Sequence, residues 1–84
     1  MHPSTPSLSL VDGLALSGLS HEQLWLRQIA VGGVAGRLET EAYVLGLLAP
    51  DAHQHNVIAH ALNEFFLEQG KPSFVGYRDT VRTQ

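Results

Sequence analysis

The sequence predicts an all-α domain, a compact bundle of three helices, and three observations support this class. Ser20 and Asp51 are each followed three residues later by glutamine, a spacing that satisfies the free N–H groups of a first helical turn. Apolar residues recur at helical spacing over residues 20–31, 37–48 and 52–69. Glycine or proline follows each of these runs, as is typical where helices end.

The first predicted helix, residues 20–31, begins at the Ser20–Gln23 capping box and ends before Gly32-Gly33. Its main apolar stripe consists of Trp25, Leu26, Ile29 and Ala30. Leu24 and Val31 fall on a second side. A helix that is apolar on two sides is central in its fold or shared with a partner.

The second predicted helix, residues 37–48, ends before Ala49-Pro50, because proline disfavours helix at the residue that precedes it. Its apolar stripe consists of Leu38, Ala42, Leu45 and Leu48. Val44 and Leu47 lie outside that stripe. This helix therefore also has more apolar surface than one packing contact buries.

The third predicted helix, residues 52–69, starts after the cap Asp51 and stops at Gly70. Its continuous apolar stripe consists of Ile58, Ala61, Leu62, Phe65 and Phe66. Across the three helices, we expect the core to draw on Leu26, Ile29, Leu38, Leu45, Ile58, Leu62 and Phe65.

The two ends of the chain frame this domain of residues 19–70. Residues 1–18 contain two prolines, two glycines and several serines, and we expect an irregular N-terminal arm. Residues 71–84 form a short C-terminal tail. Its SFVGY stretch, residues 73–77, alternates weakly and contains two aromatic residues, so we expect it to fold back over the bundle.

Three histidines, His53, His55 and His60, lie in the third predicted helix. Two ligands on one helix share a metal ion when they are three or four residues apart, and among the histidines and acids here His60 and Glu64 meet that spacing. Two ligands do not complete a tetrahedral site. We therefore expect no metal and no cofactor, although a third ligand from another subunit could complete a site.

Composition argues against several classes of function. The chain has no cysteine, no nucleophile elbow and no phosphate-binding glycine loop, and a chain of 84 residues leaves little core in which to form a substrate pocket. We expect neither an enzyme nor a small-molecule substrate. Residues 1–70 contain two arginines against seven acidic residues, which does not suit nucleic acid.

The low charge favours a role in protein interaction. Charged residues make up 15% of the chain, against about 25% in typical domains, so apolar surface must remain exposed. We expect a homodimer, or a larger protein partner, bound through Leu24, Trp25, Val31, Val44 and Leu47. Two alternatives stay open: a helix-turn-helix regulator that binds DNA, and a histidine-based module that responds to pH or metal.

The sequence also predicts a cytoplasmic location. The first twenty residues contain no lysine or arginine, so they lack the basic start of a secretory signal. No apolar run approaches the ~20 residues that span a membrane. The lack of cysteine fits a reducing compartment.

Overall fold

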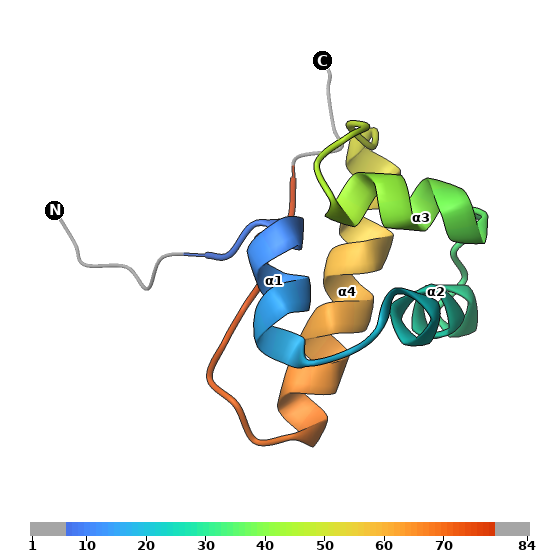
Figure 1. Ribbon diagram of the computed structural model, residues 1–84. Helices are drawn as coiled ribbons and strands as arrows, with labels where there is room; N and C mark the ends of the chain where they lie inside the picture. The colour runs from blue at the N-terminus through green and yellow to red at the C-terminus, as the bar shows by residue number, and fades with distance from the viewer. Residues whose placement is uncertain (1–6, 79–84) are drawn as a thin grey trace, which may run out of the picture.

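Four helices follow one another in the computed structural model, which describes residues 7–78 (Figure 1). They are α1 (Leu10–Ser17), α2 (His21–Ala30), α3 (Arg37–Val44) and α4 (Ala52–Glu68). Helix α4 is the longest; α1 and α2 pack against it, and α3 contacts both α1 and α2. The all-α class is confirmed, but the described chain has one helix more than expected. None of these helices is long and apolar enough to cross a membrane.

Helix α1 corrects the prediction of an irregular arm over residues 1–18. The Ser9 side chain accepts a hydrogen bond from the Asp12 N–H at 3.0 Å, which caps the first turn. Gly18 ends the helix at a φ of 78°, a left-handed conformation that suits glycine. Leu10 and Leu14, one turn apart, are both buried, so α1 is held by packing as well as by its caps.

Glycines end the other three helices through one recurring geometry. After α3, the Gly46 N–H bonds to Tyr43 O and the Leu47 N–H to Ala42 O, which is a Schellman motif. Gly32 and Gly70 have positive φ at the ends of α2 and α4, as Gly46 does after α3. The predicted helix over residues 37–48 was therefore too long, because Gly46 ends it before Pro50.

The core is built from other helix faces than the sequence predicts. The buried apolar residues are Leu10, Leu14, Leu24, Ala35, Tyr43, Val44, Ile58, Ala59, Ala61, Leu62, Phe66 and Val75. Of the expected core, Ile58 and Leu62 are buried and Phe65 packs against the cluster from its edge. Leu26, Ile29, Leu38 and Leu45 are exposed. The prediction was wrong for these four because α2 and α3 turn their other apolar sides inward.

The buried Gln28 and the partly buried Trp25 fix the loop between α2 and α3. The Gln28 amide and the Trp25 indole N–H both donate to the Ala35 carbonyl, at 3.0 Å and 3.2 Å. The Arg27 guanidinium makes a bidentate pair with Glu68, at 2.9 Å and 3.3 Å, and so ties α2 to α4. It also lies 4.6 Å from the centre of the Phe65 ring. These contacts fix α2 on α4.

The C-terminal segment, residues 73–78, folds back along the molecule, as residues 73–77 were expected to do. From the end of α4 it returns past α1 towards the N-terminal residues (Figure 1). Leu8 and Val75 form an isolated parallel β-bridge, and Val75 is 0% exposed. Val75 therefore belongs to the core although it lies outside the helices.

Candidate interaction surface

An open apolar groove of about 370 Å³ lies between α1 and the end of α3. Its lining consists of Val11, Leu14, Ala15, Gly18, Leu19, His21, Val44 and Leu45. Helix α1 contributes one wall because Ser9 and Gly18 fix its two ends and Leu10 and Leu14 hold it on the core. The other wall is the last turn of α3. Most of this lining is apolar, so the groove lacks the convergent polar groups that orient a small substrate.

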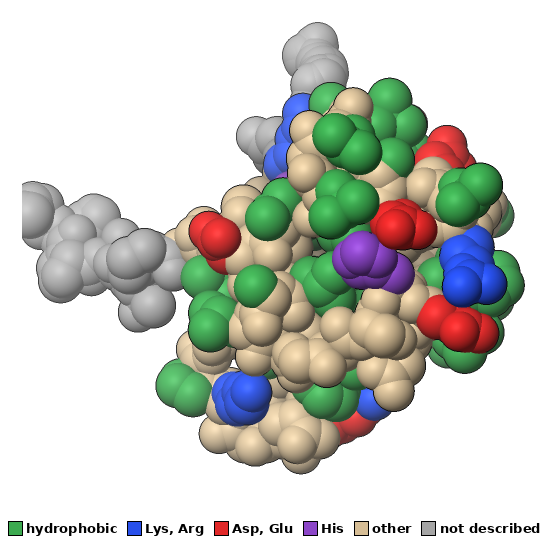
Figure 2. Space-filling model, viewed as in Figure 1, with side chains coloured by type: hydrophobic (Ala, Val, Ile, Leu, Met, Phe, Trp, Pro, Cys, Tyr) green, Lys and Arg blue, Asp and Glu red, His purple; other side chains and the backbone are tan. Residues whose placement is uncertain are grey.

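The turn after α3 extends this apolar region. Leu45, Leu47 and Leu48 are exposed, Leu47 to 77% of its full area. Gly46, within the turn, lies against Val11 of α1, since a Cβ built on it would lie 3.8 Å from the Val11 Cγ2 atom. We call Val11, Ala15, Leu45, Leu47 and Leu48 the α1–α3 surface. Figure 2 shows hydrophobic side chains over α1 and over the turn after α3 on one face of the molecule.

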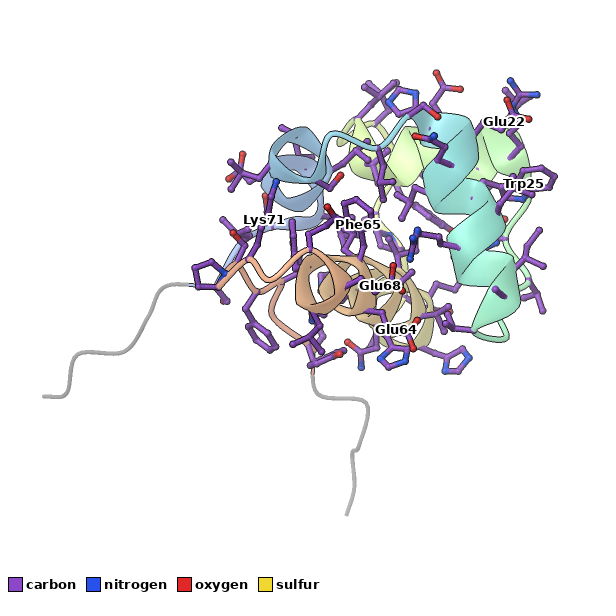
Figure 3. All side chains as sticks on the ribbon, turned by 90° about the horizontal axis from the view of Figure 1, so that it is seen from below. Glu22, Trp25, Glu64, Phe65, Glu68 and Lys71 are labelled. Carbon is purple, nitrogen blue, oxygen red and sulfur yellow. The ribbon has the colours of Figure 1, made fainter. Side chains whose placement is uncertain are left out.

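The structure separates the five residues that the sequence marked for interaction. Leu24 and Val44 are buried, at 0% and 2% exposure, so the expectation that they form a surface is wrong: they face the other helices. Trp25 and Val31 are partly buried, and Trp25 projects from α2 towards the loop before α3 (Figure 3). Leu47 lies fully on the α1–α3 surface.

The sequence does not predict Val11 and Ala15 as surface residues of a helix, because it predicts an irregular arm over residues 1–18. A signal for them was present. Ser9 stands three residues before Asp12, an acidic residue in a first turn, and Leu10 and Leu14 are one turn apart. Gly13 within this stretch obscured the pattern, since glycine disfavours a helix interior.

Two polar groups border the α1–α3 surface. His21 of the groove lies 3.3 Å from a Glu41 carboxylate oxygen. Beneath the turn, the Tyr43 hydroxyl donates to the Glu39 carboxylate at 3.1 Å and also contacts the Gln54 side-chain amide. Burial, and then the Glu39 hydrogen bond and charge, raise the pKa of Tyr43 above its ordinary value. Tyr43 therefore stays neutral and links α3 to the start of α4.

The histidines of α4 take separate partners. The His60 Nε2 atom lies 3.6 Å from the Glu64 carboxylate, whereas His55 bonds to the Gly76 carbonyl at 2.8 Å. His53 is exposed. Within residues 7–78, no three histidine or acidic side chains are grouped so that they could hold a metal ion. This arrangement offers no support for the metal-responsive alternative.

Most cations in the described chain are engaged by protein groups. Arg27 pairs with Glu68, and that hydrogen bond lowers the pKa of the Glu68 carboxyl below its ordinary value. Arg78 donates to the Pro50 carbonyl at 3.0 Å, and Lys71 to the Leu16 carbonyl at 3.2 Å. A DNA-binding face needs clustered free cations, so this geometry does not favour the helix-turn-helix alternative.

Comparisons with known protein families, with curated proteins and with solved structures found no match.

Proposed function

We propose that the chain is a non-enzymatic interaction module that pairs with a second copy of itself through the α1–α3 surface. The observation that carries this proposal is a groove and a ridge side by side. The groove is lined by Val11 and Leu45. The ridge consists of the exposed Leu47 and Leu48, which follow Leu45 after one glycine, Gly46.

This juxtaposition suits two-fold pairing. In an isologous dimer the same surface patch faces itself across the axis, so each ridge can enter the groove of the other copy. Burying a leucine side chain contributes about 1.5–3 kcal/mol, and the contact is made twice. The small number of charged residues on the chain, 15%, lowers the desolvation penalty of such a contact.

The location proposed with this function is cytoplasmic. It is supported by the complete lack of cysteine in the sequence, which suits a reducing compartment. A module without disulfides depends on its small core for stability. Pairing through apolar surface adds to that stability by mass action.

Sedimentation equilibrium at micromolar concentration tests the pairing. We expect the wild-type chain to sediment as a dimer and Leu47→Glu to sediment as a monomer with an unchanged helical circular dichroism spectrum. Leu67→Glu is the matched control, because Leu67 is 79% exposed but lies near the far end of α4 from the turn after α3 (Figure 1). A monomeric wild-type chain, or equal dissociation by Leu67→Glu, would refute the proposal.

A further inference from the structure

Two asparagines of α4 bind the backbone of the C-terminal segment in the same way. The Asn63 amide donates to Val75 O at 3.0 Å and accepts from Val75 N at 2.7 Å. The Asn56 amide does the same with Arg78, at 2.8 Å and 2.7 Å. Each side chain thus satisfies both backbone groups of one residue, as a neighbouring strand would.

The spacing of these contacts matches a helix to an extended chain. Asn56 and Asn63 are seven residues apart, which is about 10 Å along a helix at 1.5 Å per residue. Val75 and Arg78 are three residues apart, which is also about 10 Å in an extended chain. Between them, His55 bonds to the Gly76 carbonyl. Side chains of α4 therefore hydrogen-bond to the main chain of the segment at residues 75, 76 and 78.

One side chain of the segment enters the core. Val75 is 0% exposed, lies against Gly13 and belongs to the same core cluster as Leu62. A Cβ at Gly13 would come within 2.5 Å of the Val75 Cγ2 atom, so the absence of a side chain there makes room for the valine. Phe74 and Tyr77, in contrast, are exposed and pack edge to face on each other with ring centres 5.7 Å apart.

The N-terminal residues Ser7 and Leu8 close the other side of the segment. Leu8 donates to Phe74 O at 2.8 Å and accepts from the Gly76 N–H at 3.3 Å. A Cβ at Gly76 would lie 2.7 Å from the Ser7 Oγ atom and 3.0 Å from its Cβ, so a side chain at this place would require Ser7 to shift. The slot therefore favours valine followed by glycine, and leaves the flanking Phe74 and Tyr77 side chains about half exposed, at 45% and 49%.

We propose that this slot, between α4 and Ser7–Leu8, is a binding site for an extended peptide with a valine–glycine core. Residues 73–78 occupy it as an internal ligand. The exposed link Gln69–Pro72 joins the segment to α4, and none of the slot contacts depends on that link. A separate peptide of the same chemistry makes the same contacts, in the manner of strand addition at a sheet edge. This site does not overlap the α1–α3 surface and does not rest on the pairing proposed for it.

The experiment uses the full chain with a specific protease sequence inserted between Lys71 and Pro72. After folding, the link is cut, and a fluorescent peptide of residues 72–78 is titrated against cut and uncut protein by anisotropy. A tethered ligand has an effective concentration in the millimolar range. For a peptide Kd of about 10 μM, the uncut chain then binds the labelled peptide about 100-fold more weakly.

Variant peptides test the specificity without disturbing the fold of the protein. Gly76→Val in the peptide is expected to weaken binding at least about tenfold, because of the contact with Ser7. The matched control is Phe74→Leu, which changes an exposed side chain and leaves the affinity unaltered. In the protein, Asn56→Ala should weaken binding about fivefold, whereas Gln69→Ala, which removes an exposed amide at the end of α4, should not.

Two results would overturn the proposal. In one, the cut chain loses its helical circular dichroism signal, which makes the segment an inseparable part of the fold. In the other, the cut chain stays folded but binds the Gly76→Val peptide as well as the natural one, or binds neither. Saturable binding that is blocked by the intact link supports the proposal.

Discussion

Val75 and Leu47 are both apolar residues that follow the end of a helix, yet Val75 is 0% exposed and Leu47 is 77% exposed. The backbone of Val75 can be buried because Asn63 satisfies both its N–H and its carbonyl. The Leu47 N–H instead completes the Schellman motif at the end of α3 by bonding to Ala42 O, which holds the turn at the surface.

This difference shows how polar partners decide where apolar residues go. Burying an unpaired peptide group costs about 1–3 kcal/mol, comparable to the gain from burying one aliphatic side chain. A segment without helical hydrogen bonds enters the core where another element supplies donors and acceptors. Helix α4 supplies them for residues 75 and 78. The N–H groups of residues 45–48 bond instead to carbonyls of α3 itself.

The largest effect on stability is expected when a charge replaces a buried apolar side chain. Leu24→Glu puts a carboxylate at a position with 0% exposure, and we expect it to lower the free energy of unfolding by at least about 4 kcal/mol. Leu47→Glu should change it by less than about 0.5 kcal/mol at protein concentrations too low for the chains to pair. Urea denaturation followed by circular dichroism measures both. Similar losses for the two variants would contradict the burial difference.

The asparagine contacts should rank by burial. Asn63 is buried, and Asn63→Ala removes two hydrogen bonds and leaves Val75 unsatisfied, so we expect a loss of about 2–3 kcal/mol in the free energy of unfolding. Asn56→Ala acts where water can replace the amide, and about 1 kcal/mol is expected. Denaturant titrations of the two variants decide the order. A larger loss for Asn56→Ala would mean that solvent access does not set the strength of these contacts.

Gly13→Ala tests whether Val75 is buried because Gly13 has no side chain. In a helix this substitution ordinarily stabilises by about 1 kcal/mol. Here the new methyl group would meet Val75 and Leu62, and we expect a net loss of about 1–2 kcal/mol instead. Thermal unfolding of the variant gives the sign. The double variant Gly13→Ala with Val75→Ala should recover part of the loss relative to Val75→Ala alone; failure to do so would place the strain elsewhere.

The smallest effect concerns pH at the border of the α1–α3 surface. Because the pKa of Tyr43 is raised in the folded chain, the unfolded chain ionises first. The resulting contribution is fully present below the ordinary pKa of 10.0 and is lost as pH rises towards the folded value. Tyr43→Phe should lack this part of the alkaline loss. Urea titrations on either side of pH 10.0 compare the two chains, and parallel losses would exclude Tyr43 as the cause.

Local signals gave most of the helix boundaries. The Ser20–Gln23 box and the Asp51 cap form in the structure as their spacing predicts, and Gly70 ends α4. These features depend on hydrogen bonds within a few residues, so the sequence contains them fully. The stop at Gly46 and the cap at Ser9 are equally local signals. The prediction instead ended the second helix at Pro50, and it took Gly13 as a sign that residues 1–18 are not helical, although Gly13 lies inside α1.

The candidate surface was predicted only in part. The sequence predicts more apolar helix surface than the core can bury, and Leu47 is exposed as this predicts. Leu24 and Val44 could not be assigned from periodicity, since a helix with two apolar sides can bury either. The same ambiguity put Leu26 and Leu38 in the expected core, although both are exposed.

By itself, then, the sequence determined the all-α class, three of the helices and most of their ends, because capping and helical spacing are short-range. The tertiary structure alone decided which helix faces are buried and that the C-terminal segment lies against Asn56 and Asn63. Helix α1 places Leu10 and Leu14 in the core, and α3 and α4 pack against α1. Such a choice depends on contacts between residues far apart in the chain, which periodicity along one helix does not encode.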